Sequence, residues 1–148
     1  MALRYVSGDL LNASAHALVV PVNCQGIAGR GLALQCKRRY PDWFWQYQGV
    51  CRMGRLSIGT LFDYSDEDGL YIIGFPTKER WWSPTRYEHI EQGLDALVGW
   101  VASRSEWVQS VAVPKLGCGP GGLSWQQVQP LMERYLGSLS WCDVCVYV

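Results

Sequence analysis

The chain has 148 residues, of which 49% are hydrophobic and 18% are charged. These values fit one compact unit with a sizeable core, so we expect a single domain spanning residues 1–148. Thirteen basic and thirteen acidic residues give a formal net charge of zero. This balance excludes a global field that would draw the protein to nucleic acid or to an anionic membrane, so any such contact must be local.

The start of the chain and its cysteines predict a cytoplasmic protein. No basic-then-apolar signal segment opens the sequence, and no apolar run approaches the roughly 18 residues needed to span a bilayer. Six irregularly spaced cysteines in a chain too large to need disulfides favour free thiols. Cys142 and Cys145 lack the second pair that completes a zinc site, so we expect no metal.

The first half of the chain predicts two strands, a loop and two helices. The expected ranges are 3–6 and 17–22 for the strands, 23–31 for the loop, and 32–40 and 43–51 for the helices. The run Ala17–Val22 is continuously apolar, which is typical of a strand buried on both faces. Pro41 ends the first helix, and Asp42 is the expected cap of the second.

The second half predicts strands that alternate with helices. In chain order we expect strands at 59–62 and 70–75, a loop at 76–84, a helix to 101, a strand at 108–116, a loop at 117–122, a helix at 125–135 and a strand at 144–148. Thr85 with Glu88, and Ser124 with Gln127, have the spacing of capping boxes. These elements predict a three-layer α/β/α fold around a mixed, mostly parallel sheet.

Residues 117–122, here called the glycine loop, contain four glycines between a strand and a helix. Glycine has no Cβ, so its backbone N–H groups can approach a bound anion closely. The positive end of the following helix would add to the attraction. The pattern fits a diphosphate site, although a tight turn without a ligand explains this stretch equally well.

Three loops are expected to meet at the carboxyl ends of the strands, where open α/β folds bind ligands. These are the loops at 23–31, 76–84 and 117–122. Two are rich in glycine, and the third contains Lys78 and a tryptophan pair. The combination favours a phosphorylated or nucleotide-like ligand over a metal or an apolar molecule. His16 and His89 lie outside the loops and are assigned to surface or helix roles.

These residues resemble the macrodomain family, the ADP-ribose-binding α/β/α module, over nearly the whole chain. Gly8-Asp-Leu10 is similar to the family's adenine-contacting motif. Further motifs, in the right order, resemble the branch that contains the DNA ADP-ribosyl glycohydrolase antitoxins called DarG. They are Gly29-Arg-Gly-Leu-Ala-Leu-Gln35, Phe75-Pro-Thr-Lys78, Ile90-Glu-Gln-Gly-Leu94 and Gly117-Cys-Gly-Pro-Gly-Gly-Leu-Ser-Trp125.

The resemblance implies a site for ADP-ribose. Asp9 would hold the adenine amino group, the glycine loop would wrap the diphosphate, and Asn23 would contact the distal ribose. Lys78 and Asn23 are the implied catalytic residues. The implied ligand-binding set is Asp9, Leu10, Asn23, Gly29, Arg30, Gly31, Thr77, Lys78, Leu116, Gly117, Cys118, Gly119, Pro120, Gly121 and Gly122.

Lys78 has two possible roles near C1″ of that ribose. It acts as a nucleophile if burial, Arg80 or Arg86 lowers its pKa, and otherwise it acts as a stabilising cation. Related terminal ADP-ribose glycohydrolases add an aspartate in the diphosphate loop. The corresponding position here is Gly121, so that acid is absent.

The implied function is an ADP-ribosyl hydrolase that removes ADP-ribose from a thymidine- or guanosine-linked nucleobase in DNA. A non-catalytic ADP-ribose reader, and a hydrolase of protein-linked ADP-ribose or O-acetyl-ADP-ribose, are the alternatives. Trp81 and Trp82 would stack unpaired bases of single-stranded DNA or form a lid over the ligand. A cognate ADP-ribosyltransferase acting on the same substrate is the implied partner. We expect a monomer with no cofactor, no membrane contact and no toxin-sequestering second domain up to Val148.

Overall fold

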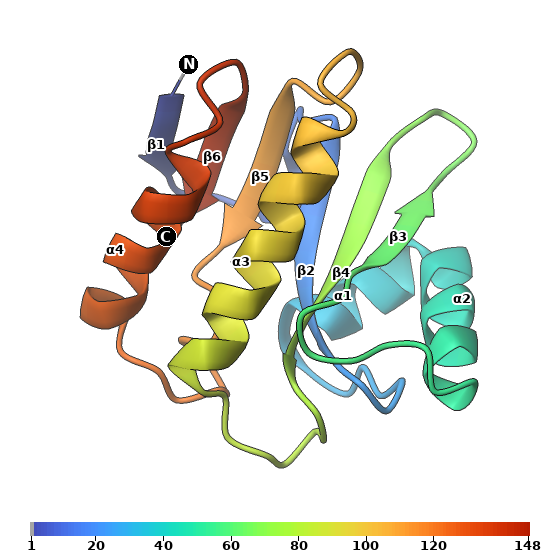
Figure 1. The fold of residues 1–148 in the computed structure, drawn as a ribbon. Coiled ribbons are helices and arrows are strands. Elements are labelled where there is room, and N and C mark those ends of the chain that lie inside the picture. Colours follow the sequence, from blue (N-terminus) through green and yellow to red (C-terminus); the bar gives the residue numbers. More distant parts are fainter. Residues whose placement is uncertain (1) are drawn as a thin grey trace.

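The computed structural model describes residues 2–148, which form a six-stranded sheet between two layers of helices (Figure 1). The strands lie in the order β1-β6-β5-β2-β4-β3, and every neighbouring pair is parallel except β3 and β4. The prediction of a mixed, mostly parallel sheet is confirmed. The strands are β1 (Ala2–Val6), β2 (Ala17–Asn23), β3 (Phe62–Ser65), β4 (Tyr71–Lys78), β5 (Ser110–Pro114) and β6 (Asp143–Tyr147).

Helices cover both faces of the sheet. They are η1 (Leu10–Asn12, a 3-10 turn), α1 (Gly31–Arg39), α2 (Pro41–Arg52), α3 (Tyr87–Ala102) and α4 (Trp125–Leu136). Successive side chains of a strand point to opposite faces, so Val19 packs in the cluster under α3 and α4, and Val20 packs in the cluster under α1 and α2. Burial on both faces explains why β2 has a continuously apolar sequence.

Strand β4 is longer than predicted, and β3 is shifted. Residues 57–60 form a turn closed by the Thr60 N–H and the Ser57 carbonyl, so β3 begins only at Phe62 and the strand predicted at 59–62 is wrong. Because β3 pairs with β4 only as far as Gly74, the end of β4 pairs with β2 alone. A strand that is hydrogen-bonded on one side only tolerates a proline. Strand β4 therefore continues through Pro76 to Lys78 instead of ending at residue 75 as predicted.

The predicted helix caps are mostly wrong. Tyr40 occupies the N-cap of α2, so Asp42 lies in the first turn instead. Helix α3 begins after Arg86 and not at Thr85, whose backbone is used in a contact with the glycine loop. Ser124 is the N-cap of α4 as predicted, but its side chain makes no capping hydrogen bond.

The carboxyl ends of β2, β4 and β5 lie side by side at the lower end of Figure 1, where the three predicted loops follow them. The amino ends of the same strands lie at the opposite end of the molecule. Among the helices of residues 2–148, none is both long and apolar enough to cross a membrane. The three predicted loops thus lie together at the carboxyl ends of these strands.

Candidate functional site

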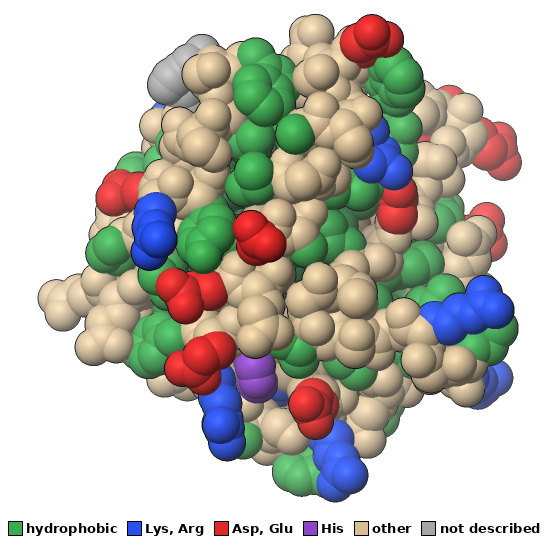
Figure 2. All heavy atoms as spheres, in the orientation of Figure 1, with side chains coloured by type: hydrophobic (Ala, Val, Ile, Leu, Met, Phe, Trp, Pro, Cys, Tyr) green, Lys and Arg blue, Asp and Glu red, His purple; other side chains and the backbone are tan. Residues whose placement is uncertain are grey.

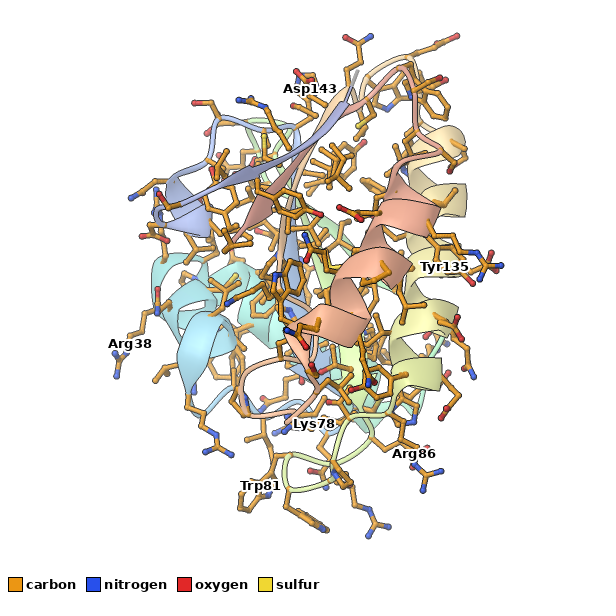
Figure 3. The ribbon with its side chains drawn as sticks, turned by 90° about the vertical axis from the view of Figure 1, so that its left-hand side faces the viewer. Arg38, Lys78, Trp81, Arg86, Tyr135 and Asp143 are labelled. Atoms are coloured by element: carbon orange, nitrogen blue, oxygen red, sulfur yellow. The ribbon has the colours of Figure 1, made fainter. Side chains whose placement is uncertain are left out.

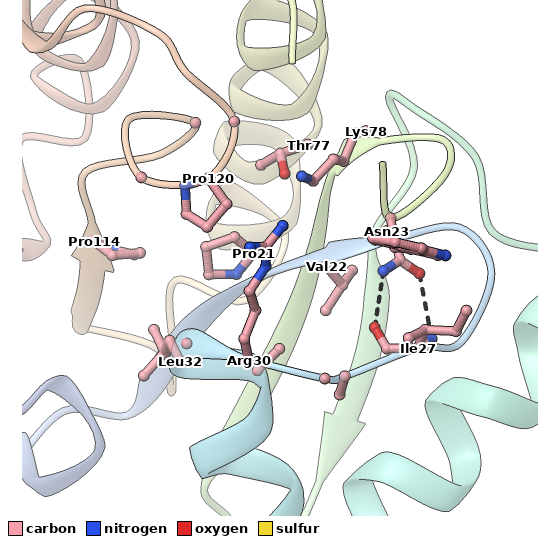
Figure 4. Close-up of a pocket in the computed structure, with 18 of the residues that line it drawn as sticks. Pro21, Val22, Asn23, Ile27, Arg30, Leu32, Thr77, Lys78, Pro114 and Pro120 are labelled. Carbon is pink, nitrogen blue, oxygen red and sulfur yellow. Dashed lines mark hydrogen bonds between the residues drawn. The ribbon is translucent and has the colours of Figure 1, made fainter. Parts of the chain in front are cut away.

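A cavity of about 450 Å³ opens at the carboxyl ends of β2, β4 and β5 (Figure 4). Its walls come from all three predicted loops and from the strand ends that carry them, so the expected convergence is confirmed. The lining residues are Pro21, Val22, Asn23, Ile27, Ala28, Gly29, Arg30, Gly31, Leu32, Ala33, Thr77, Lys78, Trp81, Pro114, Lys115, Gly117, Gly119, Pro120 and Gly121.

Most of the predicted ligand-binding residues line this cavity, and five do not. Those that line it are Asn23, Gly29, Arg30, Gly31, Thr77, Lys78, Gly117, Gly119, Pro120 and Gly121; those outside its lining are Asp9, Leu10, Leu116, Cys118 and Gly122. Leu10 and Leu116 are core residues, with 4% and 0% of their surface exposed. The Asp9 carboxylate accepts a hydrogen bond from the Leu11 N–H at 3.0 Å, as the cap of η1. A contact of these five residues with a ligand stays a prediction.

Asn23 ends β2 and fixes the first loop, residues 24–30, through its side-chain amide. Its Oδ1 accepts hydrogen bonds from the backbone N–H groups of Gln25 at 3.0 Å and Ile27 at 3.3 Å. Its Nδ2 donates to the Ile27 carbonyl oxygen at 2.8 Å (Figure 4). An amide nitrogen carries two hydrogens, so one N–H of Asn23 is left for a bound molecule.

The hydroxyl of Tyr47 on α2 completes the hydrogen bonds around Asn23. Its oxygen lies 2.7 Å from the Asn23 carbonyl oxygen and 2.9 Å from Oδ1. Burial raises the pKa of Tyr47, so the phenol keeps its proton and donates. Sequence reasoning missed this residue, because its helical spacing with Trp43 and Phe44 is also that of an ordinary core stripe.

Lys78 is the strand neighbour of Asn23. The register of β2 and β4 shifts between Val22 and Asn23, which places Asn23 opposite Lys78. The Lys78 amino group points into the cavity near the Arg30 side chain (Figure 4). Burial, and then the positive charge of Arg30, lower the pKa of Lys78. The prediction that Arg80 or Arg86 supplies this charge is wrong, because the residue that acts on Lys78 comes from the first loop.

The glycine loop forms the wall of the cavity that faces the first loop, and its backbone is held by hydrogen bonds within the loop. The Leu123 N–H donates to the Gly117 carbonyl at 2.9 Å, and the Gly122 N–H donates to the Gly119 carbonyl at 3.0 Å. Gly117 has φ +75°, a backbone conformation that residues other than glycine rarely adopt. Across the described residues, no acceptor is found for the N–H groups of Gly119 and Gly121, and both residues line the cavity.

Gly121 has no room for a side chain. A Cβ there would lie 2.5 Å from Thr85 Oγ1 and 2.7 Å from the Gly117 carbonyl oxygen. The Thr85 N–H donates to the Gly121 carbonyl at 3.2 Å, which holds the two loops together. The Thr85 hydroxyl is buried and has no hydrogen-bond partner within residues 2–148. This packing excludes an aspartate at the position where some relatives carry one.

Two further polar residues lie closer to the site than the sequence indicated. Lys115 lines the cavity, with its Nζ 6.0 Å from the centre of the Trp125 ring. His89 Nδ1 lies 3.2 Å from the Thr77 carbonyl oxygen, so α3 contacts the end of β4 next to Lys78. Lys115 lies two residues before the glycine loop, and this proximity is the one signal that pointed to it. His89 carried no comparable signal.

The cysteines form no disulfide, and the thiols of Cys36 and Cys142 are buried. Burial raises the pKa of the Cys36 thiol to about 12. Within the part of the chain that the structure describes, no group of three His, Cys, Asp or Glu side chains is placed to hold a metal ion.

Comparison with known proteins places this geometry in a family. Residues 19–132 match the Macro domain family model. The DNA ADP-ribosyl glycohydrolase of Mycobacterium tuberculosis is 42% identical over 148 residues, which cover 98% of this chain and 42% of that protein. This chain thus spans about two fifths of the length of the DNA ADP-ribosyl glycohydrolases that it matches.

Solved structures agree with the family model. The macrodomain of Thermus aquaticus DarG has a TM-score of 0.92 at 41% identity, covering 99% of this chain and 97% of that one. Thermosipho africanus DarTG in complex with ADP-ribose has a TM-score of 0.90 at 34% identity, covering 99% of this chain and 42% of that one. With the family model matching most of the sequence, the chain belongs to the Macro domain family.

Proposed function

We propose that this chain is an ADP-ribosyl hydrolase that removes ADP-ribose from a thymidine- or guanosine-linked nucleobase in DNA. The observation that carries the proposal is the pairing of Lys78 with Asn23 at one wall of a cavity whose other wall is the glycine loop. One wall can address a sugar while the other holds a diphosphate. The identity to DNA ADP-ribosyl glycohydrolases supports this choice of substrate.

Positioning is the first task of the site. The free N–H groups of Gly119 and Gly121 would bind the diphosphate, and the remaining N–H of Asn23 would donate to a hydroxyl of the distal ribose. Both sets of donors are fixed before the ligand arrives. Holding a reactant in one geometry supplies a large share of catalysis, because the entropy of orientation is lost on binding and not during the reaction.

Lys78 is assigned the nucleophilic role. Its lowered pKa makes the neutral amine more available than that of an ordinary lysine. The amine adds to C1″, the C1″–N bond to the base breaks, and the base leaves with a proton. The lysine-linked ribose then opens at its C1″–O4″ bond, and O4″ takes the remaining proton of the amine, which leaves an imine between Lys78 and C1″. Water then hydrolyses the imine and releases ADP-ribose. Gly121 supplies no acid at this loop position, so we assign the proton taken up by the base to the one that the attacking amine loses.

A hydrolase of this kind implies an enzyme that makes its substrate. We therefore include in the proposal a cognate ADP-ribosyltransferase that modifies the same bases, with single-stranded DNA as the modified polymer. We also propose that the protein acts as a monomer.

The test compares the wild-type protein with Lys78→Ala and Lys78→Arg on thymidine- and guanosine-ADP-ribosylated single-stranded DNA and on ADP-ribosylated protein. Released ADP-ribose is measured by chromatography, and binding of free ADP-ribose is measured by calorimetry. Lys78→Ala should slow release from DNA by about 10²- to 10⁴-fold and still bind ADP-ribose. Lys78→Arg keeps the charge without a usable amine, so it should be as slow as the alanine variant.

Each other outcome has a separate meaning. An active Lys78→Arg variant would assign Lys78 the role of a cation. Release from modified protein alone would move the substrate to protein-linked ADP-ribose. Binding without release from any substrate would identify a reader of ADP-ribose. Failure to bind free ADP-ribose would overturn the proposed function as a whole.

A further inference from the structure

Two exposed tryptophans stand at the rim of the cavity. Trp81 lines the cavity with 48% of its surface exposed, and Trp82 is 57% exposed outside it. Their ring centres are 5.6 Å apart and the ring planes meet at 83°. In Figure 3, Trp81 projects from the molecule below Lys78, at the end opposite Asp143. Large aromatic faces in this position are available to whatever extends out of the cavity.

The segment that carries them, Arg80–Ser83, is here called the rim turn, and it is fixed to the first loop. The Ser83 N–H donates to the Arg80 carbonyl at 3.0 Å, which closes the turn. The Trp81 N–H donates to Gln25 Oε1 at 3.0 Å, and the Cys24 N–H donates to the Glu79 carbonyl at 3.0 Å. Binding to a turn that is already ordered requires little further loss of entropy.

The charge around the rim turn is locally basic, although the whole chain is neutral. Residues 76–86 contain three basic residues, Lys78, Arg80 and Arg86, and one acidic residue, Glu79. The Arg80 guanidinium lies 5.4 Å above the Trp82 ring. Basic side chains stand beside hydrophobic ones at the lower edge of Figure 2. Aromatic faces next to arginines form the combination that stacks unpaired bases and contacts their phosphates.

We propose that the rim turn binds the nucleotide next to the modified one in a single-stranded nucleic acid. Trp82 stacks on the neighbouring base, and Arg80 contacts the phosphate between the two nucleotides. This inference rests on the proposed function, because the modified nucleotide must enter the cavity first. Trp82 does not line the cavity, so its contribution is to recognition of the strand and not to hydrolysis.

The test measures kcat and KM on two substrates with the same linkage, an ADP-ribosylated oligonucleotide and an ADP-ribosylated mononucleoside. Trp82→Ala should raise KM for the oligonucleotide by about 5- to 100-fold, the range of one base stacked on an aromatic ring, and leave the mononucleoside unchanged. Trp82→Phe should recover most of the loss. Trp107→Ala is the matched control, since Trp107 is also 57% exposed and lies in the segment before β5, at the opposite end of the sheet.

Binding of an unmodified fluorescent oligothymidylate, followed by anisotropy, tests the rim turn independently of hydrolysis. Trp82→Ala should weaken it, and Arg80→Gln should reduce the slope of log affinity against log salt by about 0.7. Equal effects of Trp82→Ala on both substrates, or no effect on either, would overturn the proposal. If no modified DNA is hydrolysed but the anisotropy result holds, the proposed function fails and the nucleic-acid surface stands.

Discussion

The first loop and the glycine loop line opposite sides of one cavity, yet they are held in different ways. The first loop is fixed by hydrogen bonds from side chains, namely the Asn23 amide and the Tyr47 hydroxyl. The glycine loop is fixed by backbone hydrogen bonds and by close packing around Gly117 and Gly121, where no side chain fits. Substitutions that remove a hydrogen-bonding side-chain atom should therefore loosen the first loop. Substitutions that add a side chain should distort the glycine loop.

The difference matches what each loop presents. Side-chain groups on the first loop and its flanks, such as the Asn23 amide and the Arg30 guanidinium, suit a sugar and a reacting centre that must be addressed individually. Bare N–H groups on the glycine loop suit a diphosphate, which needs several equivalent donors at short range. Each loop thus offers the kind of group that we propose for its part of the ligand.

The largest effect is expected from adding one methyl group to the glycine loop. Gly121→Ala places a Cβ 2.5 Å from Thr85 Oγ1 and 2.7 Å from the Gly117 carbonyl oxygen. We expect a destabilisation of about 1–3 kcal/mol and weaker binding of ADP-ribose, because the loop must move. Thermal unfolding and calorimetry measure the two effects, and Gly121→Asp should be no more active than the alanine variant.

Gly99→Ala on α3 is the matched control for that substitution. A Cβ at Gly99 meets no atom within 4 Å, so this variant should be unchanged or more stable by up to about 1 kcal/mol. Wild-type affinity for ADP-ribose in Gly121→Ala would show that the packing around the glycine loop does not determine its function.

An intermediate effect is expected from removing one oxygen beside the first loop. Tyr47→Phe keeps the ring in the core but leaves the Asn23 oxygens without this donor, which should cost about 1–2 kcal/mol of folding stability. It should also lower kcat more than it raises KM, because a loosened Asn23 amide no longer holds the ribose in one orientation. Steady-state kinetics and thermal unfolding measure both effects.

Tyr64→Phe is the control for Tyr47→Phe. Tyr64 is 8% exposed in the same hydrophobic cluster, and its hydroxyl makes no hydrogen bond among the described residues. Its loss should leave kcat unchanged. Equal kinetics for the two variants would mean that Asn23 keeps its orientation without the phenol.

The smallest effect concerns the charge at the end of the first loop. The nucleophilic form of Lys78 is the neutral one, so the rate should rise with pH as Lys78 loses its proton, with an inflection below the ordinary pKa of 10.5. Removing the positive charge of Arg30 favours protonated Lys78 and raises its pKa. Arg30→Gln should thus move the inflection of the pH–rate profile upward.

Arg30→Lys retains the charge, so its inflection should stay near that of the wild type. A profile of kcat/KM against pH for the three proteins decides the matter. An inflection that stays in place in Arg30→Gln would leave burial as the sole cause of the lowered pKa of Lys78.

The parts of the molecule that depend on local sequence were predictable. A run such as Ala17–Val22 is apolar because it is buried on both sides, and the glycines of 117–122 predicted a loop that the structure places at the wall of a cavity. What failed depends on contacts between distant segments. Thr85 caps no helix because it contacts Gly121, and β4 passes Pro76 because its neighbour β3 has already ended.

The same division applies to the site. Lys78 was singled out by resemblance, since a lysine beside Glu79 and Arg80 looks like a solvated charge when it is judged by spacing alone. Its pairing with Asn23 follows from strand register, and the influence of Arg30 on its pKa follows from the meeting of two chain segments. Tyr47 could not be distinguished from a core aromatic, because its function lies in one hydroxyl group.

The pairing of Asn23 with Lys78 has a consequence for protein engineering. Both residues are the last residues of strands, so the sheet and its core set the distance between them, and the surrounding loops do not. The rim turn can therefore be exchanged for a turn of another composition while the reacting pair stays in place. If the rim turn recognises the strand as proposed, a library built only at residues 80–83 would vary which polymer is recognised and leave the bond that is cut the same.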